Sequence, residues 1–188
     1  MRRSSSRRAR IALIVGLAAP ALGCQGPDYF PGFTIKGPTF GPNGTAFEPV
    51  SRVVESRCGT LDCHGATFRP LRIYGQFGLR RPLKPGEDKT IDFKNYYSGG
   101  SVPTTKEELL ENYESMLGLE PELTQAVIDK EPEATPDTLT LFRKPRLTEK
   151  HKGGHIWNAG APGDLCMAGW ISGTDFTQDC NKEVPATK

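Results

Sequence analysis

Residues 56–65 read SRCGTLDCHG and place two cysteines and a histidine within one short loop. Four residues separate Cys58 from Cys63, and His64 follows the second cysteine directly. Two interpretations fit this spacing: a covalent attachment site for a metal-bearing cofactor, or a small disulfide loop followed by an unrelated histidine. The sequence on either side of the loop bears on the choice.

The order of thiol, thiol and imidazole is the one that covalent haem attachment requires. Two cysteine thiols add across the vinyl groups of the porphyrin, and the histidine after the second thiol reaches the iron. The usual gap between the cysteines is two residues, whereas the loop GTLD (residues 59–62) supplies four. A longer loop can bulge without moving His64 relative to Cys63, so the spacing is compatible with haem.

Further blocks follow this loop in the chain: KPRLTEKHKGGHIW at residues 144–157 and GWISG at residues 169–173. With them, residues 47–174 resemble the single-haem cytochrome c domains of planctomycete-type secreted bacterial proteins. The resemblance implies a small cytochrome c-like helical domain with one haem c. It also implies that Cys58 and Cys63 form the thioethers and that His64 is the proximal iron ligand.

Candidates for the sixth position of the iron are few. The resemblance ranks His151 first, ahead of His155 and Met167, and a five-coordinate iron stays open as an alternative. Met116 lies on the apolar face of an expected helix, where core packing is the more frequent role of a methionine.

Two further cysteines suit a structural disulfide. Cys166 and Cys180 enclose thirteen residues, and a loop of that length is stabilised by roughly 3 kcal/mol when it is closed. The rival to the haem hypothesis is a non-catalytic envelope protein without cofactor, in which Cys58 and Cys63 form a second disulfide or the four cysteines pair in a crossed order. Such a protein would bind a partner through its loops.

Two other chemistries are less favoured by the spacing. A zinc site has a permitted ligand set in Cys58, Cys63, His64 and either His151 or His155. Adjacent cysteine and histidine side chains are, however, poorly placed to share one tetrahedral ion, and zinc thiolates are uncommon in oxidising compartments. A thiol oxidoreductase normally has two residues between its cysteines.

The N-terminus has the features of an export signal. Five arginines lie in the first ten residues, and the apolar run Ile11–Gly23 is too short to span a bilayer. The letters LGC that end at Cys24 resemble the lipobox of bacterial lipoproteins, which implies cleavage after residue 23 and a lipid on Cys24. An ordinary secretory signal is the alternative. Gln25 favours sorting to the outer membrane.

Charge and motifs exclude several classes of function. The chain has 24 basic and 22 acidic residues. Removal of residues 1–23, with their five arginines, leaves 19 basic and 22 acidic residues, a net charge of −3. No basic block remains for nucleic acid, and no P-loop, nucleophile elbow or dinucleotide fingerprint is present. We therefore expect electron transfer or redox sensing at the cell envelope, with an unidentified redox partner, rather than substrate conversion.

The composition predicts a mainly α fold with much irregular structure, because 21 Gly and 16 Pro interrupt regular elements. Residues 24–46 are expected to form a Gly/Pro-rich tether, residues 47–181 the domain and residues 182–188 a disordered tail. The aromatic residues of the tether could instead pack onto the domain.

Several elements can be placed within the domain. Helices are expected over residues 47–57, 105–118, 120–131 and 162–171, and in the first of them Val50, Val53 and Val54 recur at three- and four-residue spacing. A capping box of Thr105 and Glu108 begins the second helix, and Trp170 packs inward in the last, which Gly173 ends. Extended segments are expected at residues 71–75 and 135–146. The carboxylates of residues 106–114 are expected on the solvated face of their helix.

Overall fold

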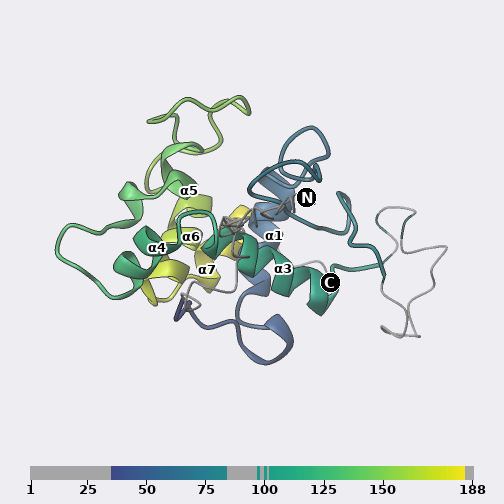
Figure 1. Ribbon diagram of the computed structural model, residues 1–188, viewed down its shortest axis with the longest axis horizontal. Helices are drawn as coiled ribbons and strands as arrows, with labels where there is room; N and C mark the ends of the chain where they lie inside the picture. Colours follow the sequence, from purple (N-terminus) through teal and green to yellow (C-terminus); the bar gives the residue numbers. More distant parts are fainter. Residues whose placement is uncertain (1–34, 84–96, 98–99, 101, 185–188) are drawn as a thin grey trace, which may run out of the picture. The chain divides into compact units, whose positions relative to one another are not determined.

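The computed structural model describes residues 35–83, 97, 100 and 102–184, and its regular structure is helical (Figure 1). The predicted mainly α fold class is therefore confirmed. Across the described residues no helix is long and apolar enough to cross a bilayer. The elements are η2 (Pro42–Gly44), α1 (Glu48–Arg57), α3 (Lys106–Leu117), α4 (Pro121–Ile128), η3 (Pro136–Thr138), α5 (Thr140–Arg143), α6 (Pro162–Ser172) and α7 (Thr177–Glu183).

Helix α1 carries the chain into the cysteine-histidine loop. Its first turn contains Pro49. Proline has no main-chain N–H, and an N–H in the first turn of a helix has no acceptor within the helix, so no helical hydrogen bond is lost. Val50, Val53 and Val54 are buried on one face, as the three- and four-residue spacing predicted. The helix ends at Arg57, so Cys58 is its C-cap.

Helices α6 and α7 close the C-terminal part of the domain. Helix α6 ends at Gly173, whose φ of 68° lies in the left-handed region that glycine adopts without strain. The predicted disulfide between Cys166 and Cys180 is present and joins α6 to α7. The sequence did not predict α7. The chain stays helical to Glu183, within the segment expected to be disordered, and residues 185–188 lie outside the described residues.

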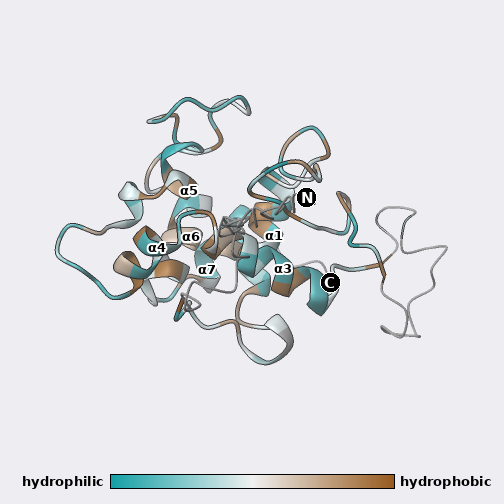
Figure 2. Cartoon of the chain, viewed as in Figure 1, coloured by the Kyte–Doolittle hydropathy of each residue, from teal (hydrophilic) through white to brown (hydrophobic). Residues whose placement is uncertain are grey.

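The hydrophobic core lies between α1, α3, α5 and α6. Phe47 and Trp170 are 0% and 1% exposed, with their ring centroids 5.1 Å apart. Met116 is buried in the same cluster, as predicted for a core methionine. In Figure 2, brown hydrophobic residues gather on the helices, whereas the loop beyond α5 is mostly teal or white.

Part of the predicted tether belongs to the folded domain. Residues 35–46 lie in the same compact unit as the helices. The ring of Phe40 packs on that of Tyr113 at 5.1 Å, and the Tyr113 hydroxyl donates to the Pro38 carbonyl at 2.6 Å. The lipidation and signal predictions for residues 1–34 lie outside the described residues.

The extended segment predicted at residues 135–146 is wrong, because the chain forms η3 and α5 there. The carboxylate of Glu120 accepts hydrogen bonds from the Thr140 N–H at 2.6 Å and the Thr140 hydroxyl at 2.7 Å. It thereby satisfies a donor at the start of α5. A cap supplied from twenty residues earlier gives no local sequence signal.

Helix α3 begins with the predicted capping box of Thr105 and Glu108. Glu108 is nevertheless fully buried, so its predicted place on a solvated face is wrong. Its carboxylate forms an ion pair with Arg80 at 2.9 Å, between side chains that are 0% and 4% exposed. A buried carboxylate needs such a partner, because desolvation penalises its charge.

A row of polar side chains on and just before α3, which we call the α3 polar stripe, holds segment 72–81. This segment turns at residues 76–78, and Tyr74 pairs with Leu79 in an isolated β-bridge. The stripe consists of Thr104, Glu108, Asn112 and Ser115. These side chains accept from main-chain N–H groups at residues 72, 74, 76 and 81: Arg72 to Ser115 (2.9 Å), Tyr74 to Asn112 (2.7 Å), Gln76 to Thr104 (3.1 Å) and Arg81 to Glu108 (3.0 Å). The stripe thus supplies the acceptors that these four main-chain N–H groups need.

Asn112 is the centre of the stripe. Besides accepting from the Tyr74 N–H, its amide donates to the Tyr74 carbonyl at 2.8 Å and to the Ser51 hydroxyl at 3.1 Å.

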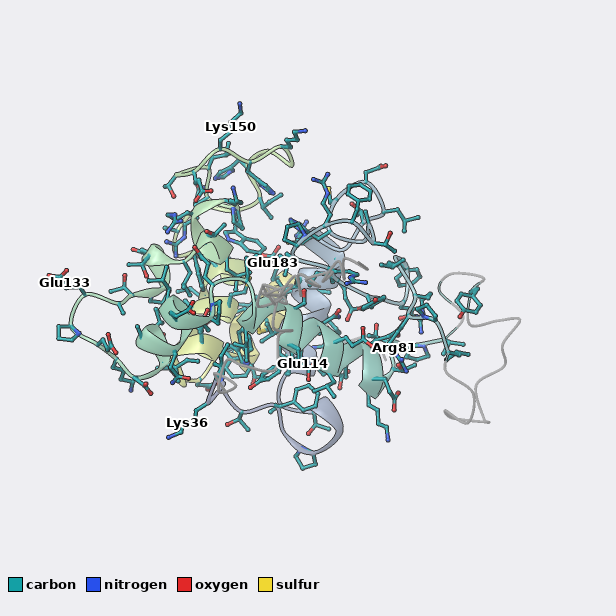
Figure 3. All side chains as sticks on the ribbon, in the orientation of Figure 1. Lys36, Arg81, Glu114, Glu133, Lys150 and Glu183 are labelled. Carbon is teal, nitrogen blue, oxygen red and sulfur yellow. A yellow bond between two sulfur atoms is a disulfide. The ribbon has the colours of Figure 1, made fainter. Side chains whose placement is uncertain are left out.

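Asn112→Ala should lower the free energy of unfolding by about 2–4 kcal/mol, because it leaves buried polar groups without partners. Urea unfolding measures the change. Glu114→Ala, which removes an exposed carboxylate from the same helix (Figure 3), should change stability by less than about 1 kcal/mol. Equal effects of both variants would contradict this account of the stripe.

A second carboxylate, Glu55, makes stability depend on pH. Burial raises its pKa, although hydroxyl groups of Thr104 and Ser51 donate to it at 2.6 and 2.7 Å. The folded state therefore binds this proton more tightly than the unfolded state. The resulting stabilisation is complete below the pKa of Glu55 in the unfolded state and is lost as pH rises through its pKa in the folded state.

Glu55→Gln should remove this decrease of the free energy of unfolding with rising pH, measured by urea unfolding between about pH 4 and pH 8. An unchanged pH profile would rule out Glu55 as its source.

Candidate functional site

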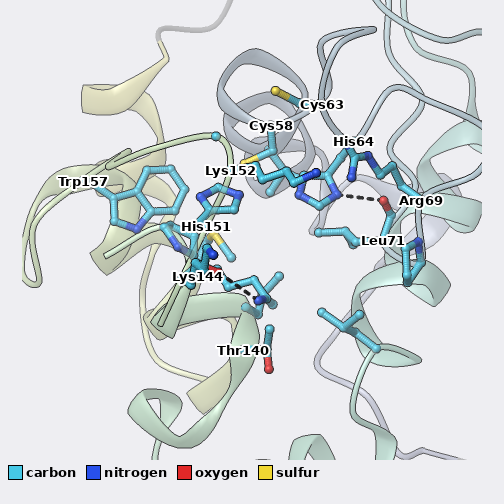
Figure 4. Close-up of a pocket in the computed structure, with 18 of the residues that line it drawn as sticks. Cys58, Cys63, His64, Arg69, Leu71, Thr140, Lys144, His151, Lys152 and Trp157 are labelled. Carbon is cyan, nitrogen blue, oxygen red and sulfur yellow. Dashed lines mark hydrogen bonds between the residues drawn. The ribbon is translucent and has the colours of Figure 1, made fainter. Parts of the chain in front are cut away.

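A pocket of about 350 Å³ lies beside the cysteine-histidine loop (Figure 4). One wall comes from the end of α1 and residues 62–71, and the other from residues 140–157 with Met167 of α6. Much of the lining is apolar: Val54, Leu71, Leu119, Leu141, Trp157 and Met167. Its volume and apolar walls are typical of a site for a small organic molecule or cofactor.

Main-chain hydrogen bonds fold the loop so that its extra residues bulge outward. The His64 N–H donates to the Cys58 carbonyl at 2.9 Å, and the Cys63 N–H donates to the Thr60 carbonyl at 2.9 Å. Leu61, in the middle of the four-residue gap, is 63% exposed. Cys58, Cys63 and His64 consequently all line the pocket despite the long spacing.

Gly65 allows this compact loop. A Cβ atom at this position would lie 2.3 Å from the Gly59 carbonyl oxygen and 2.8 Å from that of Thr60. Real side chains do not approach main-chain oxygens so closely, so only glycine fits without displacing the loop. The glycine after the histidine is therefore a packing requirement of the cysteine-histidine loop.

His64 is held in one orientation and one tautomer. Its Nδ1 lies 2.9 Å from the Leu71 carbonyl oxygen, which can only accept, so Nδ1 carries the proton. The Nε2 lone pair is then available. In Figure 4 the bond to Leu71 leaves the ring on the side away from His151. Burial lowers the pKa of His64, which favours the neutral ring that binds metals.

His151 faces His64 across the pocket. Its Nδ1 lies 3.0 Å from the Gly154 carbonyl oxygen, so it too has a free Nε2. The ring centroids are 6.3 Å apart, and the ring planes differ by 20°. Two imidazoles on one metal, each nitrogen about 2 Å from the ion and about 1 Å from its ring centre, would have centroids about 6 Å apart. The observed distance between the ring centroids is therefore close to the distance expected for two imidazoles on one ion.

The other two distal candidates lie elsewhere. His155 is exposed and does not contribute to the pocket. Met167 is 2% exposed and lines the pocket wall near Trp157, within the hydrophobic cluster. Of the three predicted candidates, only His151 pairs with His64.

Cys58 and Cys63 carry free thiols and Cys166 is bonded to Cys180, so neither the second disulfide nor the crossed pairing of the rival hypothesis is present in this structure. Burial raises the pKa of the Cys58 thiol to about 12. A redox-active thiol needs the opposite shift, which argues against an oxidoreductase. Within the described residues, no group of three or more His, Cys, Asp or Glu side chains is arranged to hold a metal ion, so the zinc set does not assemble.

Comparison with known protein families, curated proteins and solved structures finds no match to this chain. The functional argument therefore depends on the residues and geometry of the pocket.

Sequence reasoning missed the groups that surround the predicted ligands. The Leu71 carbonyl that orients His64 gives no signal, because any residue supplies a carbonyl. Arg69 and Lys152 also line the pocket. Lys152 directly follows the predicted His151, and that position was the available signal for it, whereas Arg69 lies five residues after His64 and gave none.

Gly65→Ala tests the loop geometry. Because the added methyl group meets main-chain oxygens, the variant should be less stable by about 1–3 kcal/mol, and the Cys58–Cys63–His64 arrangement should be disturbed. Gly118→Ala is the control: φ at Gly118 is −77°, and its Cβ would lie 3.0 Å from the Glu114 carbonyl oxygen, against 2.3 Å from the Gly59 carbonyl oxygen at Gly65. Alanine at Gly118 should therefore cost less than about 1 kcal/mol. Thermal or urea unfolding provides the comparison. If Gly65→Ala is as stable as the control, the close approach is unimportant.

Proposed function

We propose that this chain is an exported lipoprotein that carries one covalently bound c-type haem and acts in electron transfer or redox sensing at the cell envelope. Cys58 and Cys63 would attach the porphyrin, and His64 and His151 would be the axial ligands. A bound haem supplies a one-electron couple between two oxidation states of iron.

The observation that carries the proposal is the pairing of His64 with His151. Both rings hold their Nδ1 protons on main-chain carbonyl oxygens, as metal-binding histidines commonly do. Their centroids lie 6.3 Å apart. An iron with four porphyrin nitrogens needs only two protein ligands, so two opposed imidazoles complete its coordination.

The remaining walls of the pocket suit the same cofactor. Val54, Leu71, Leu141 and Trp157 line the pocket. They would present apolar surface to a porphyrin and exclude water from its iron, and such burial is one of the factors that set the reduction potential. The Cys58 thiol, with its raised pKa, is a poor nucleophile by itself. Attachment is therefore expected to need a maturation system.

Export and the lipid anchor rest on the sequence of residues 1–24. A cytochrome c-like assignment and export support each other, because c-type haem is attached outside the cytoplasm. The alternative is an envelope protein without haem, in which the four cysteines of the domain form two disulfides.

Covalent attachment is testable by expression with a cytochrome c maturation system. The wild-type chain should retain haem on a denaturing gel stained for haem. Cys58→Ala and Cys63→Ala should each weaken that signal, and the double variant should abolish it, because each thiol supplies one thioether. Absence of haem from the wild type, while a control cytochrome matures, would contradict the proposal. So would a double variant that stains like the wild type.

The axial ligands are testable with a matched pair of variants. In the matured protein, His151→Ala should convert a six-coordinate low-spin absorption spectrum to a high-spin one, because it removes the distal imidazole. His155→Ala, four residues along the same loop and exposed, should leave the spectrum unchanged. A low-spin spectrum in His151→Ala would assign the sixth position to another group.

A further inference from the structure

A second pocket, of about 320 Å³, lies beside a different part of the cysteine-histidine loop. It shares no lining residue with the pocket in Figure 4. Its walls come from α1 and the start of the loop, from the turn at residues 76–78, and from Val184, the C-cap of α7. The proposed haem function gives this second pocket no role.

Phe77 supplies an aromatic surface in the second pocket, where its side chain is 81% exposed. Two main-chain hydrogen bonds close the turn that carries it: the Gly78 N–H donates to the Gly75 carbonyl at 3.1 Å, and the Gly75 N–H donates to the Leu79 carbonyl at 2.9 Å. The ring packs against Gly100, where a Cβ atom would lie 2.6 Å from a ring carbon. The ring is therefore supported by the chain while most of its surface stays open to a ligand.

Uncharged hydrogen-bonding groups line other parts of the second pocket. Ser56 and Thr60 are exposed, and neither hydroxyl group forms a hydrogen bond with the residues that the structure describes. The Gln76 side chain donates through Nε2 to the Gly100 carbonyl at 2.7 Å, which leaves its Oε1 as an acceptor. The pocket thus offers two hydroxyl groups and one amide oxygen to a ligand.

The charged side chains among the described lining residues, Arg52 and Glu55, already have partners in the protein. The Arg52 guanidinium lies 3.3 Å from the Glu48 carboxylate. The Glu55 carboxylate accepts from the hydroxyl groups of Ser51 at 2.7 Å and Thr104 at 2.6 Å. An ionic ligand would find no free counter-charge on these walls, and a desolvated charge without a partner is costly. The second pocket therefore favours a neutral ligand.

We propose that the second pocket binds a neutral sugar ring, such as one hexose unit of a glycan, with one face of the sugar on Phe77. A hexose ring has apolar C–H groups on its faces and hydroxyl groups around its edge. The aromatic ring covers the C–H groups, and Ser56, Thr60 and Gln76 form hydrogen bonds with the hydroxyl groups. An apolar surface with a few well-placed polar groups is typical of small-molecule sites. This activity is separate from electron transfer and needs no haem.

NMR titration of the isotope-labelled full chain tests the binding, with methyl glucoside, methyl galactoside and N-acetylglucosamine as probes. At least one of these sugars should shift the main-chain N–H signals of residues 59–60 and 75–78 in a saturable manner. The dissociation constant should be about 1–10 mM, because a single ring makes few contacts. Acetate and ethylammonium, which are small and charged, should leave the same signals unchanged.

Matched variants test the contacts. Phe77→Ala should weaken binding at least about tenfold, because it removes the surface for the sugar face. Thr60→Val should weaken it about two- to tenfold, because it removes one hydrogen bond. Phe68→Ala is the control: it removes an aromatic side chain that is 78% exposed and lies outside the second pocket, so binding should match the wild type. Urea unfolding checks that each variant keeps the fold.

Three outcomes would overturn the inference: no saturable shift with any of the three sugars, binding that survives Phe77→Ala, or equal weakening by Phe77→Ala and Phe68→Ala. Binding of acetate or ethylammonium at the same residues would overturn the assignment to a neutral ligand. None of these results bears on the haem proposal, because Cys58, Cys63, His64 and His151 do not line the second pocket.

Discussion

The hydrogen bonds between the α3 polar stripe and segment 72–81 are the constraint on which the rest of the domain depends. Apart from the bridge between Tyr74 and Leu79, that segment pairs with no strand among the described residues. The buried N–H groups of Tyr74 and Arg81 would therefore lack acceptors if α3 did not carry polar side chains on this face. Asn112 binds both main-chain polar groups of Tyr74 and reaches Ser51 on α1. Three elements are thereby held at fixed separations by one amide side chain.

The stripe also supports the candidate site, through the residues that it orders. Leu71, just before the segment, presents its carbonyl to His64, and the His64 carbonyl accepts from the Ile73 N–H at 2.8 Å. The imidazole is thus oriented from both its ring and its main chain. His151 depends on a different and more local support, the Gly154 carbonyl within its own loop. The two walls of the pocket are therefore built independently.

Local patterns in the sequence were sufficient for the elements whose signals are local. The capping box at Thr105, the valine spacing of α1 and the glycine that ends α6 each predicted an element that the structure contains. The two wrong predictions, an exposed Glu108 and an extended segment at residues 135–146, have a common cause. Glu108 forms a buried ion pair with Arg80, and the first N–H of α5 donates to Glu120. Both partners are distant in the sequence. The candidate site likewise combines residues that local sequence patterns predict with a contact that depends on distant parts of the chain. Cys58, Cys63 and His64 follow from spacing, whereas the opposition of His64 and His151 depends on two walls that only the folded chain brings together.

We propose that Cys58 and Cys63 of the cysteine-histidine loop attach one haem covalently rather than forming a disulfide. Intact-mass spectrometry of the denatured chain, after expression with a cytochrome c maturation system, tests it most directly. The account predicts the mass of the chain with one haem and with the single disulfide of Cys166 and Cys180. A haem-free mass that corresponds to two disulfides would contradict it.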